Sequence, residues 1–128
     1  MADIDKRTQQ EIETNVGRCL EGFVREYLGR TPQRLRVHLR ENMVVARIQS
    51  RLTAAEERLL AAPDKGRDLI KQMRTDLVEL ARPIVSALVE EIVGIKVLSL
   101  HYDLSTVTGE EVILFTLVKT PPFLLLRK

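Results

Sequence analysis

A long apolar pattern between Asp64 and Gly94 limits the folds that this chain can adopt. Large apolar residues recur there at steps of three or four, which places them in one stripe of an α-helix. The stripe consists of Leu69, Met73, Leu77, Leu80, Ile84, Leu88 and Ile92. The pattern predicts a core helix over 64–94 that ends at Gly94, since glycine readily adopts the left-handed conformation after a last helical turn. A bend is expected near Arg82, because Pro83 cannot donate a backbone hydrogen bond.

Two other segments carry helical signals. Residues 8–28 place apolar side chains on one face, namely Ile12, Val16, Cys19, Leu20, Phe23, Val24 and Tyr27. Cys19 is the single cysteine, and we expect it to be a small buried side chain rather than a reactive thiol. Thr53 and Glu56 have the spacing of a capping box, which predicts a short helix that ends at about Ala62, before Pro63.

Two β-hairpins are expected. The first joins residues 35–39, where apolar and basic side chains alternate, to residues 43–48 through a turn at Glu41-Asn42. The second joins residues 95–102 to residues 112–118 around Thr108-Gly109-Glu110. The order of elements predicts an α+β fold, in which an N-terminal helix, a short helix and a long Pro-kinked helix pack on a four-stranded antiparallel sheet.

The length of 128 residues fits a single domain over 1–128, with a core at about 8–118 and an apolar tail at 119–128. We expect the tail from Phe123 to Lys128 to fold back on the core, to cover a sheet edge or to contact the second subunit of a homodimer. The chain has no apolar run that could form a signal peptide or a transmembrane segment. We therefore expect a cytoplasmic protein, with a peripheral position at the membrane left open.

Motifs for catalysis and for metal binding are lacking, so we expect a non-enzymatic protein with no cofactor and no metal site. An enzyme is the least favoured alternative. It would rest on His101 and Asp103, which lie two positions apart and would share one face of a strand. Such a pair could orient an imidazole or be an ordinary polar pair at the end of a strand.

Arginine is concentrated in one part of the chain. From Arg30 to Arg51 there are six arginines, one acid (Glu41) and no lysine. The planar guanidinium group binds carboxylate, bicarbonate or phosphate oxygens through two hydrogen bonds, although a solvated sheet face explains the same pattern equally well. If the stretch is a binding site, a small anion such as bicarbonate or an acidic partner is expected to contact Arg30, Arg36, Arg47, Arg74 and His101.

Nucleic-acid binding through the same basic hairpin is the alternative function. The chain has 20 basic and 18 acidic residues, a balance that does not suit a protein that neutralises many phosphates. Aromatic residues make up 4% of the chain and tryptophan is missing, so no row of rings is available for base stacking. Both observations make nucleic acid the less favoured partner.

Several short motifs resemble the MpsC family. They lie at Tyr27–Pro32, Leu52–Glu56, Gly66–Lys71, Arg82-Pro83, Gly94–Val97, His101–Glu110 and Val112–Phe115. The resemblance extends from about Thr8 to Leu117. It implies a small bacterial accessory or regulatory protein, similar to partners of a membrane system tied to sodium translocation, membrane potential and inorganic-carbon uptake. It implies no known reaction.

Overall fold

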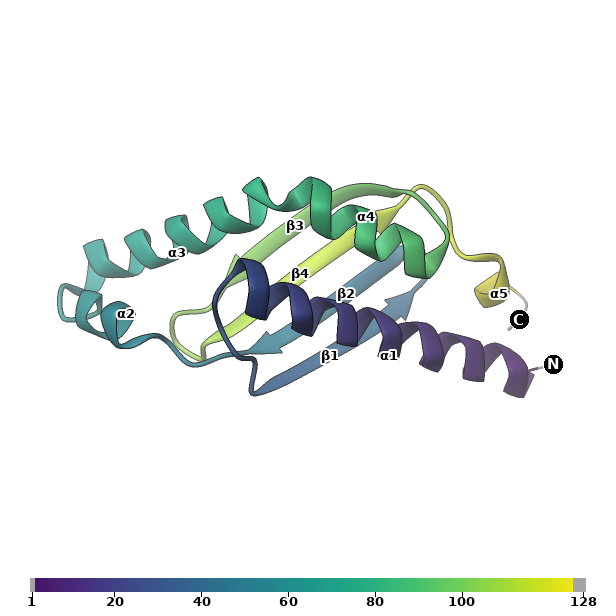
Figure 1. Ribbon diagram of the computed structural model, residues 1–128, viewed down its shortest axis with the longest axis horizontal. Coiled ribbons are helices and arrows are strands. Elements are labelled where there is room, and N and C mark those ends of the chain that lie inside the picture. The colour runs from purple at the N-terminus through teal and green to yellow at the C-terminus, as the bar shows by residue number, and fades with distance from the viewer. Residues whose placement is uncertain (1, 126–128) are drawn as a thin grey trace.

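The computed structural model describes residues 2–125, and of residues 2–7, 63 and 64 the backbone alone. Helices cover one face of a four-stranded antiparallel sheet, which confirms the predicted α+β class (Figure 1). In chain order the elements are α1 (Ala2–Tyr27), β1 (Arg34–Arg40), β2 (Met43–Gln49), α2 (Ala54–Leu59), α3 (Pro63–Leu80), α4 (Arg82–Val93), β3 (Val97–Leu104), β4 (Glu110–Leu117) and α5 (Pro122–Leu125).

The sheet has the strand order β1-β2-β4-β3, so each predicted hairpin supplies one edge strand and one central strand. Glu41 and Asn42 form the tight turn between β1 and β2, and Glu41 has a φ of 54°. Gly109 lies in the turn between β3 and β4 with a φ of 80°, and a Cβ atom there would come within 3.0 Å of the Ser50 carbonyl oxygen. This turn therefore requires glycine.

The core lies between the sheet and the helices α1 and α4, which pack against each other (Figure 1). Alternate residues of each strand point toward it, as the period of two requires. Its fully buried members in the helices and in β4 include Val16, Leu20, Val24, Val85, Val89, Ile113 and Phe115. The opposite face of the sheet carries the basic side chains of β1 and stays exposed.

The region predicted as one bent helix forms two helices, α3 and α4, which are separated by Ala81. Ala81 has φ −90° and ψ 1°, outside the helical range, and Pro83 follows in the first turn of α4. The bend therefore falls at the predicted place. Gly94 ends α4 with a φ of 80°, in the left-handed conformation expected of it.

The side of α3 and α4 predicted to form the core is confirmed only in part. Leu77 and Ile92 are partly buried against the core, whereas four other residues of the predicted stripe are exposed. Leu69, Met73, Leu80 and Ile84 of the predicted stripe are 52%, 46%, 79% and 42% exposed. The buried stripe lies one position further along the chain and consists of Ile70, Arg74, Val78, Ala81, Val85, Val89 and Val93. Both stripes have helical spacing, so periodicity alone could not choose between them. The stripe that packs toward the sheet has mostly smaller side chains. The exposed, longer side chains form what we call the outer stripe, which consists of Leu69, Met73, Leu80 and Ile84.

The smaller elements follow the prediction with local differences. In α1, Tyr27 is 47% exposed and Cys19 is only partly buried, so these two do not belong to the core. The capping box of α2 is present, with Thr53 and Glu56 exchanging hydrogen bonds of 3.1 and 2.8 Å, but α2 ends at Leu59.

Part of the apolar tail folds back on the core. The helix α5 packs beside α1, with Phe123 and Leu124 partly buried against the core. The last three residues of the predicted tail, 126–128, lie outside the described residues. Among the helices that the structure describes, none has the length and apolar character needed to span a membrane.

Candidate functional site

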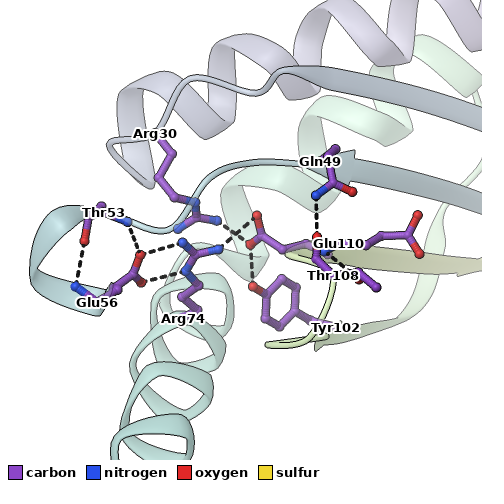
Figure 2. A network of polar contacts seen from close by, with 9 residues as sticks. Arg30, Gln49, Thr53, Glu56, Arg74, Tyr102, Thr108 and Glu110 are labelled. Atoms are coloured by element: carbon purple, nitrogen blue, oxygen red, sulfur yellow. Dashed lines mark hydrogen bonds and ion pairs between the residues drawn. The ribbon is translucent and has the colours of Figure 1, made fainter. Parts of the chain in front are cut away.

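Two of the predicted site residues, Arg30 and Arg74, meet inside the protein (Figure 2). Arg30 follows α1 and Arg74 lies in α3, and their side chains are 6% and 0% exposed. Both pair with Glu111 of β4, whose carboxylate is fully buried. The Nη2 of Arg30 donates a hydrogen bond to Glu111 Oε1, while Arg74 Nη1 lies 3.3 Å from Glu111 Oε2.

Glu56 of α2 is the second acceptor for Arg74. The Nε and Nη2 atoms of Arg74 donate hydrogen bonds of 2.8 and 2.7 Å to the two oxygens of Glu56, which is the strong two-bond geometry of arginine and carboxylate. The same carboxylate accepts a hydrogen bond of 2.8 Å from the backbone of Thr53. Glu56 therefore caps α2 and also ties it to α3.

The hydroxyl of Tyr102, in β3, donates a hydrogen bond to Glu111 and completes a buried ion-pair cluster. The members of this cluster are Arg30, Glu56, Arg74, Tyr102 and Glu111. Two guanidinium groups face two carboxylates, so the charges balance inside the protein. The cluster joins α2, α3, β3, β4 and the segment after α1, which gives it a clear structural role.

The pKa values of Glu56 and Arg74 are shifted in the directions that favour their charged forms. Burial alone would raise the pKa of Glu56, but the hydrogen bonds from Arg74 and Thr53 outweigh burial and hold this pKa below its usual value. Burial lowers the pKa of Arg74, and hydrogen bonding to Glu56 with the nearby carboxylates reverses that effect, so the pKa is raised. Burial and the Glu111 carboxylate raise the pKa of Tyr102, which keeps its hydroxyl protonated as a donor.

The pKa of Arg30 moves against its charge. Burial lowers the pKa of its guanidinium group, and the attraction of Glu111 offsets only part of this effect. Arginine nevertheless stays protonated at neutral pH, because its ordinary pKa is far above 7.

The other two predicted arginines, Arg36 and Arg47, lie together on the exposed face of the sheet. They are opposite each other in the register of β1 and β2, so their side chains project from the same face. With Arg34 and Arg40 of β1 they form what we call the arginine face. Arg34, Arg36 and Arg47 line a hollow of about 160 Å³ with Gln49 and Glu110.

Few acidic groups balance the arginine face. Arg47 pairs with Glu110 at 2.8 Å, and its side chain is still 56% exposed. Within the described residues, Arg34, Arg36 and Arg40 form no ion pair with a carboxylate. This surface, unlike the buried cluster, has guanidinium groups free to bind a charged partner.

The fifth predicted residue, His101, is not brought close to the arginines. It lies on β3 at the opposite edge of the sheet, with β4 and β2 between it and β1. Its Nε2 is 3.2 Å from the Ser99 hydroxyl, and Asp103 instead pairs with Lys71 at 3.2 Å. Within the described residues, His101 and Asp103 therefore contact different partners and form no hydrogen bond with each other.

Sequence reasoning missed Glu111 and Tyr102. A signal for Glu111 was present, because the period of two in β4 places it on the same face as Ile113, Phe115 and Leu117. A carboxylate on a buried face requires a cation, and only the fold shows that Arg30 and Arg74 supply it. In the part of the chain that is described, no group of three or more His, Cys, Asp or Glu side chains is arranged to hold a metal ion.

Comparisons with known proteins agree with the resemblance seen in the sequence. The family model for the Na⁺-translocating membrane potential-generating system (MpsC) matches residues 8–119. The uncharacterized protein YbcI of Bacillus subtilis (strain 168) is 31% identical over 112 residues, which cover 88% of this chain and 90% of YbcI. No solved structure matches the chain. The match over most of the chain shows that this protein belongs to the MpsC family.

Proposed function

We propose that this protein is a non-enzymatic accessory or regulatory protein of a Na⁺-translocating, membrane potential-generating system. It acts in the cytoplasm, at the membrane surface, and binds an acidic partner through the arginine face. Membership of the MpsC family supports the link to such a system. Arg30 and Arg74 are buried and ion-paired with carboxylates of the same chain, so the proposed contacts are made by the arginines on the sheet.

The observation that carries the binding proposal is the juxtaposition of Arg36 and Arg47 across β1 and β2. Like charges directly opposite each other destabilise a sheet unless something compensates them. Glu110 compensates Arg47, and within the described residues no carboxylate compensates Arg36. A carboxylate-rich partner would supply the missing charge through two-bond contacts.

A small anion such as bicarbonate is the second candidate ligand of the same face. The hollow lined by Arg34, Arg36 and Arg47 supports it, because about 160 Å³ accommodates a small oxyanion with its water. Glu110 projects into the same hollow and would repel an anion. For this reason an acidic protein surface, which contacts the arginines over a wider area, is the preferred ligand.

Homodimer formation is part of the proposal. The outer stripe of α3 and α4 supports it, because this stripe exposes four large apolar side chains that a second copy could cover. Replacing Leu80 and Ile84 by glutamate tests the idea by sedimentation. We expect the native protein to have twice the mass of one chain and the double variant to be a monomer, whereas a native monomer would refute the dimer.

Binding is tested with a triple variant, Arg34→Ala with Arg36→Ala and Arg47→Ala. Calorimetry with polyglutamate, bicarbonate, sulfate and phosphate should show binding by the native protein and loss of binding by the triple variant. Arg25→Ala is the matched control, since Arg25 is an exposed arginine that pairs with Glu21 on α1. Equal binding by all three proteins, or none by the native protein, would refute the arginine face as the site.

The link to the membrane system requires a measurement in cells. We expect that a strain lacking this protein has a lowered membrane potential at high sodium, measured with a potentiometric dye, and that the native chain restores it. The triple variant should not restore it, while Arg25→Ala should.

The nucleic-acid alternative is tested by a gel shift with DNA and RNA across a salt series, because binding to phosphates weakens steeply as salt rises.

A further inference from the structure

The edge strand β1 has its outer backbone capped at one end only. The backbone N–H of Leu39 donates to the Glu13 carboxylate at 2.7 Å, and the Leu39 carbonyl accepts from the Gln9 amide at 2.7 Å. An amide has a single hydrogen, so Leu39 points away from β2 and toward α1. Residues at every second position of a strand share that direction, and therefore the backbones of Leu35 and Val37 also point away from the sheet.

The outward groups of Leu35 and Val37 have no partner within the described residues. They open into a groove of about 690 Å³ between α1 and β1. Gly17 of α1 lines this groove, and a Cβ atom there would be in ordinary van der Waals contact with the side chains of Leu35 (3.6 Å) and Val37 (3.7 Å). Figure 1 shows β1 at the edge of the sheet with α1 alongside. Unpaired edge groups of this kind are a template for another strand.

The side chains of β1 indicate which strand would fit. On the exposed face, a strand added beside β1 would meet Arg34, Arg36 and His38 at every second position. On the helix side it would meet Leu35, Val37 and Thr14. The matching segment has acidic side chains on one face and small or apolar side chains on the other.

A second copy of this chain fits the groove poorly. Antiparallel pairing of β1 with its own copy centred on Arg36 would place Arg36 opposite Arg36. Pairing centred on Val37 would place Arg34 opposite Arg40, with Arg36 opposite His38. The arginines that face each other in either arrangement oppose pairing. Charge complementarity thus favours an acidic segment of a different protein.

We infer that the groove beside β1 receives an extended acidic segment of a partner protein, which joins the sheet as a fifth strand through the backbones of Leu35 and Val37. This inference rests on the proposed function, whose acidic partner it specifies. Backbone pairing provides the affinity, and alternating contacts with the arginine face provide the specificity. The capped Leu39 limits the added strand to the end of β1 nearest Arg34.

The probe is a capped synthetic peptide of about six residues, the usual length of a strand, in which glutamate alternates with valine. We expect calorimetric binding, with slower hydrogen exchange at the amides of Leu35 and Val37. Arg36→Ala should weaken binding roughly two- to fivefold, the range of an exposed ion pair. Val37→Pro removes the outward N–H without removing a bond to β2, so it should weaken binding at least tenfold.

Further peptides keep the test independent of how well Val37→Pro folds. Two peptides are N-methylated at every second backbone amide, one at the odd positions and the other at the even positions. Both keep every charge, but each lacks the N–H donors on one edge of the strand. The peptide that lacks the donors facing β1 should fail to bind. Equal binding of all these peptides, with no protection of Leu35 and Val37, would overturn the strand pairing. If Arg36→Ala still weakened binding in that case, the proposed function would stand without the added strand.

Two other outcomes are also decisive. If no acidic peptide binds the native protein, both the added strand and the arginine face are refuted. If sedimentation shows a dimer that Val37→Pro converts to a monomer, a second copy occupies the groove and the acidic segment is refuted. Circular dichroism and thermal unfolding of each variant confirm that the comparison is made between folded proteins.

Discussion

Arg74 holds Glu56 through two hydrogen bonds of 2.8 and 2.7 Å inside the protein, where their side chains are 0% and 4% exposed. Replacing Arg74 by methionine leaves two buried carboxylates, Glu56 and Glu111, without this cation. Breaking a buried ion pair on one side costs about 3–5 kcal/mol, because the remaining charge stays desolvated. We expect Arg74→Met to lower the free energy of unfolding by that amount in urea titrations.

The control for Arg74→Met is Arg82→Ala. Arg82 also pairs with a glutamate, Glu79, but both side chains are about half exposed. Exposed pairs of this kind contribute about 0–1 kcal/mol. Similar losses of stability in the two variants would show that Arg74 is not held in a buried ion pair.

The depressed pKa of Glu56 predicts that stability falls in acid. The unfolded chain binds a proton to this carboxylate at a higher pH than the folded protein does, so its contribution is complete above the unfolded pKa of about 4.3. It is then lost as the pH falls through the folded pKa. Unfolding measured between about pH 6 and 3 should show a steeper decline for the native protein than for Glu56→Gln. Parallel curves for the two proteins would contradict the prediction.

Gly66 allows α2 and α3 to approach each other closely. A Cβ atom at this position would lie 1.7 Å from the backbone oxygen of Leu59, which is far inside van der Waals contact. Gly66→Ala must therefore push α2 away from α3, and with it the Glu56 side chain that pairs with Arg74. We expect the free energy of unfolding to fall by roughly 3 kcal/mol, the upper end of the cost of overpacking.

Gly22 is a position where substitution by alanine should stabilise the protein, in contrast to Gly66. It lies inside α1, and a Cβ atom there would have no atom within 4 Å outside its own helix. Alanine is the better helix former by about 1 kcal/mol, so Gly22→Ala should stabilise the protein by up to that amount. If both glycine variants changed the melting temperature in the same direction, the close contact between Gly66 and Leu59 would be disproved.

The local elements of this fold could be predicted because their signals are local. The ends of helices and strands are determined here by residues close in the chain. Examples are the turn residues at Glu41-Asn42 and around Gly109, the capping box of Thr53 and the left-handed Gly94. The α+β class followed from the order of these elements. The alternation of apolar and basic side chains in β1 was predicted for the same reason, and it places Arg34, Arg36 and Arg40 on the exposed face.

The arrangements that could not be predicted depend on residues far apart in the chain. Arg30 and Glu111 are separated by 81 positions, and nothing near Arg30 distinguishes it from the exposed Arg34. Arg74 lies on a helix with two apolar stripes, and only the packing against the sheet shows that its own stripe faces inward. Periodicity shows that one face of the helix is buried. It does not show which face this is when two adjacent faces both carry apolar side chains.

The choice between these two stripes can be measured with a pair of alanine substitutions. Val89 is fully buried in the inner stripe, so Val89→Ala removes packed atoms and should lower the free energy of unfolding by about 2 kcal/mol. Leu80 is 79% exposed in the outer stripe, so Leu80→Ala should change it by less than about 0.5 kcal/mol, although leucine is the larger side chain. Urea titrations at a dilution that keeps the chain monomeric separate this effect from any dimer contact at Leu80. A larger cost for Leu80→Ala than for Val89→Ala would mean that the outer stripe forms the core.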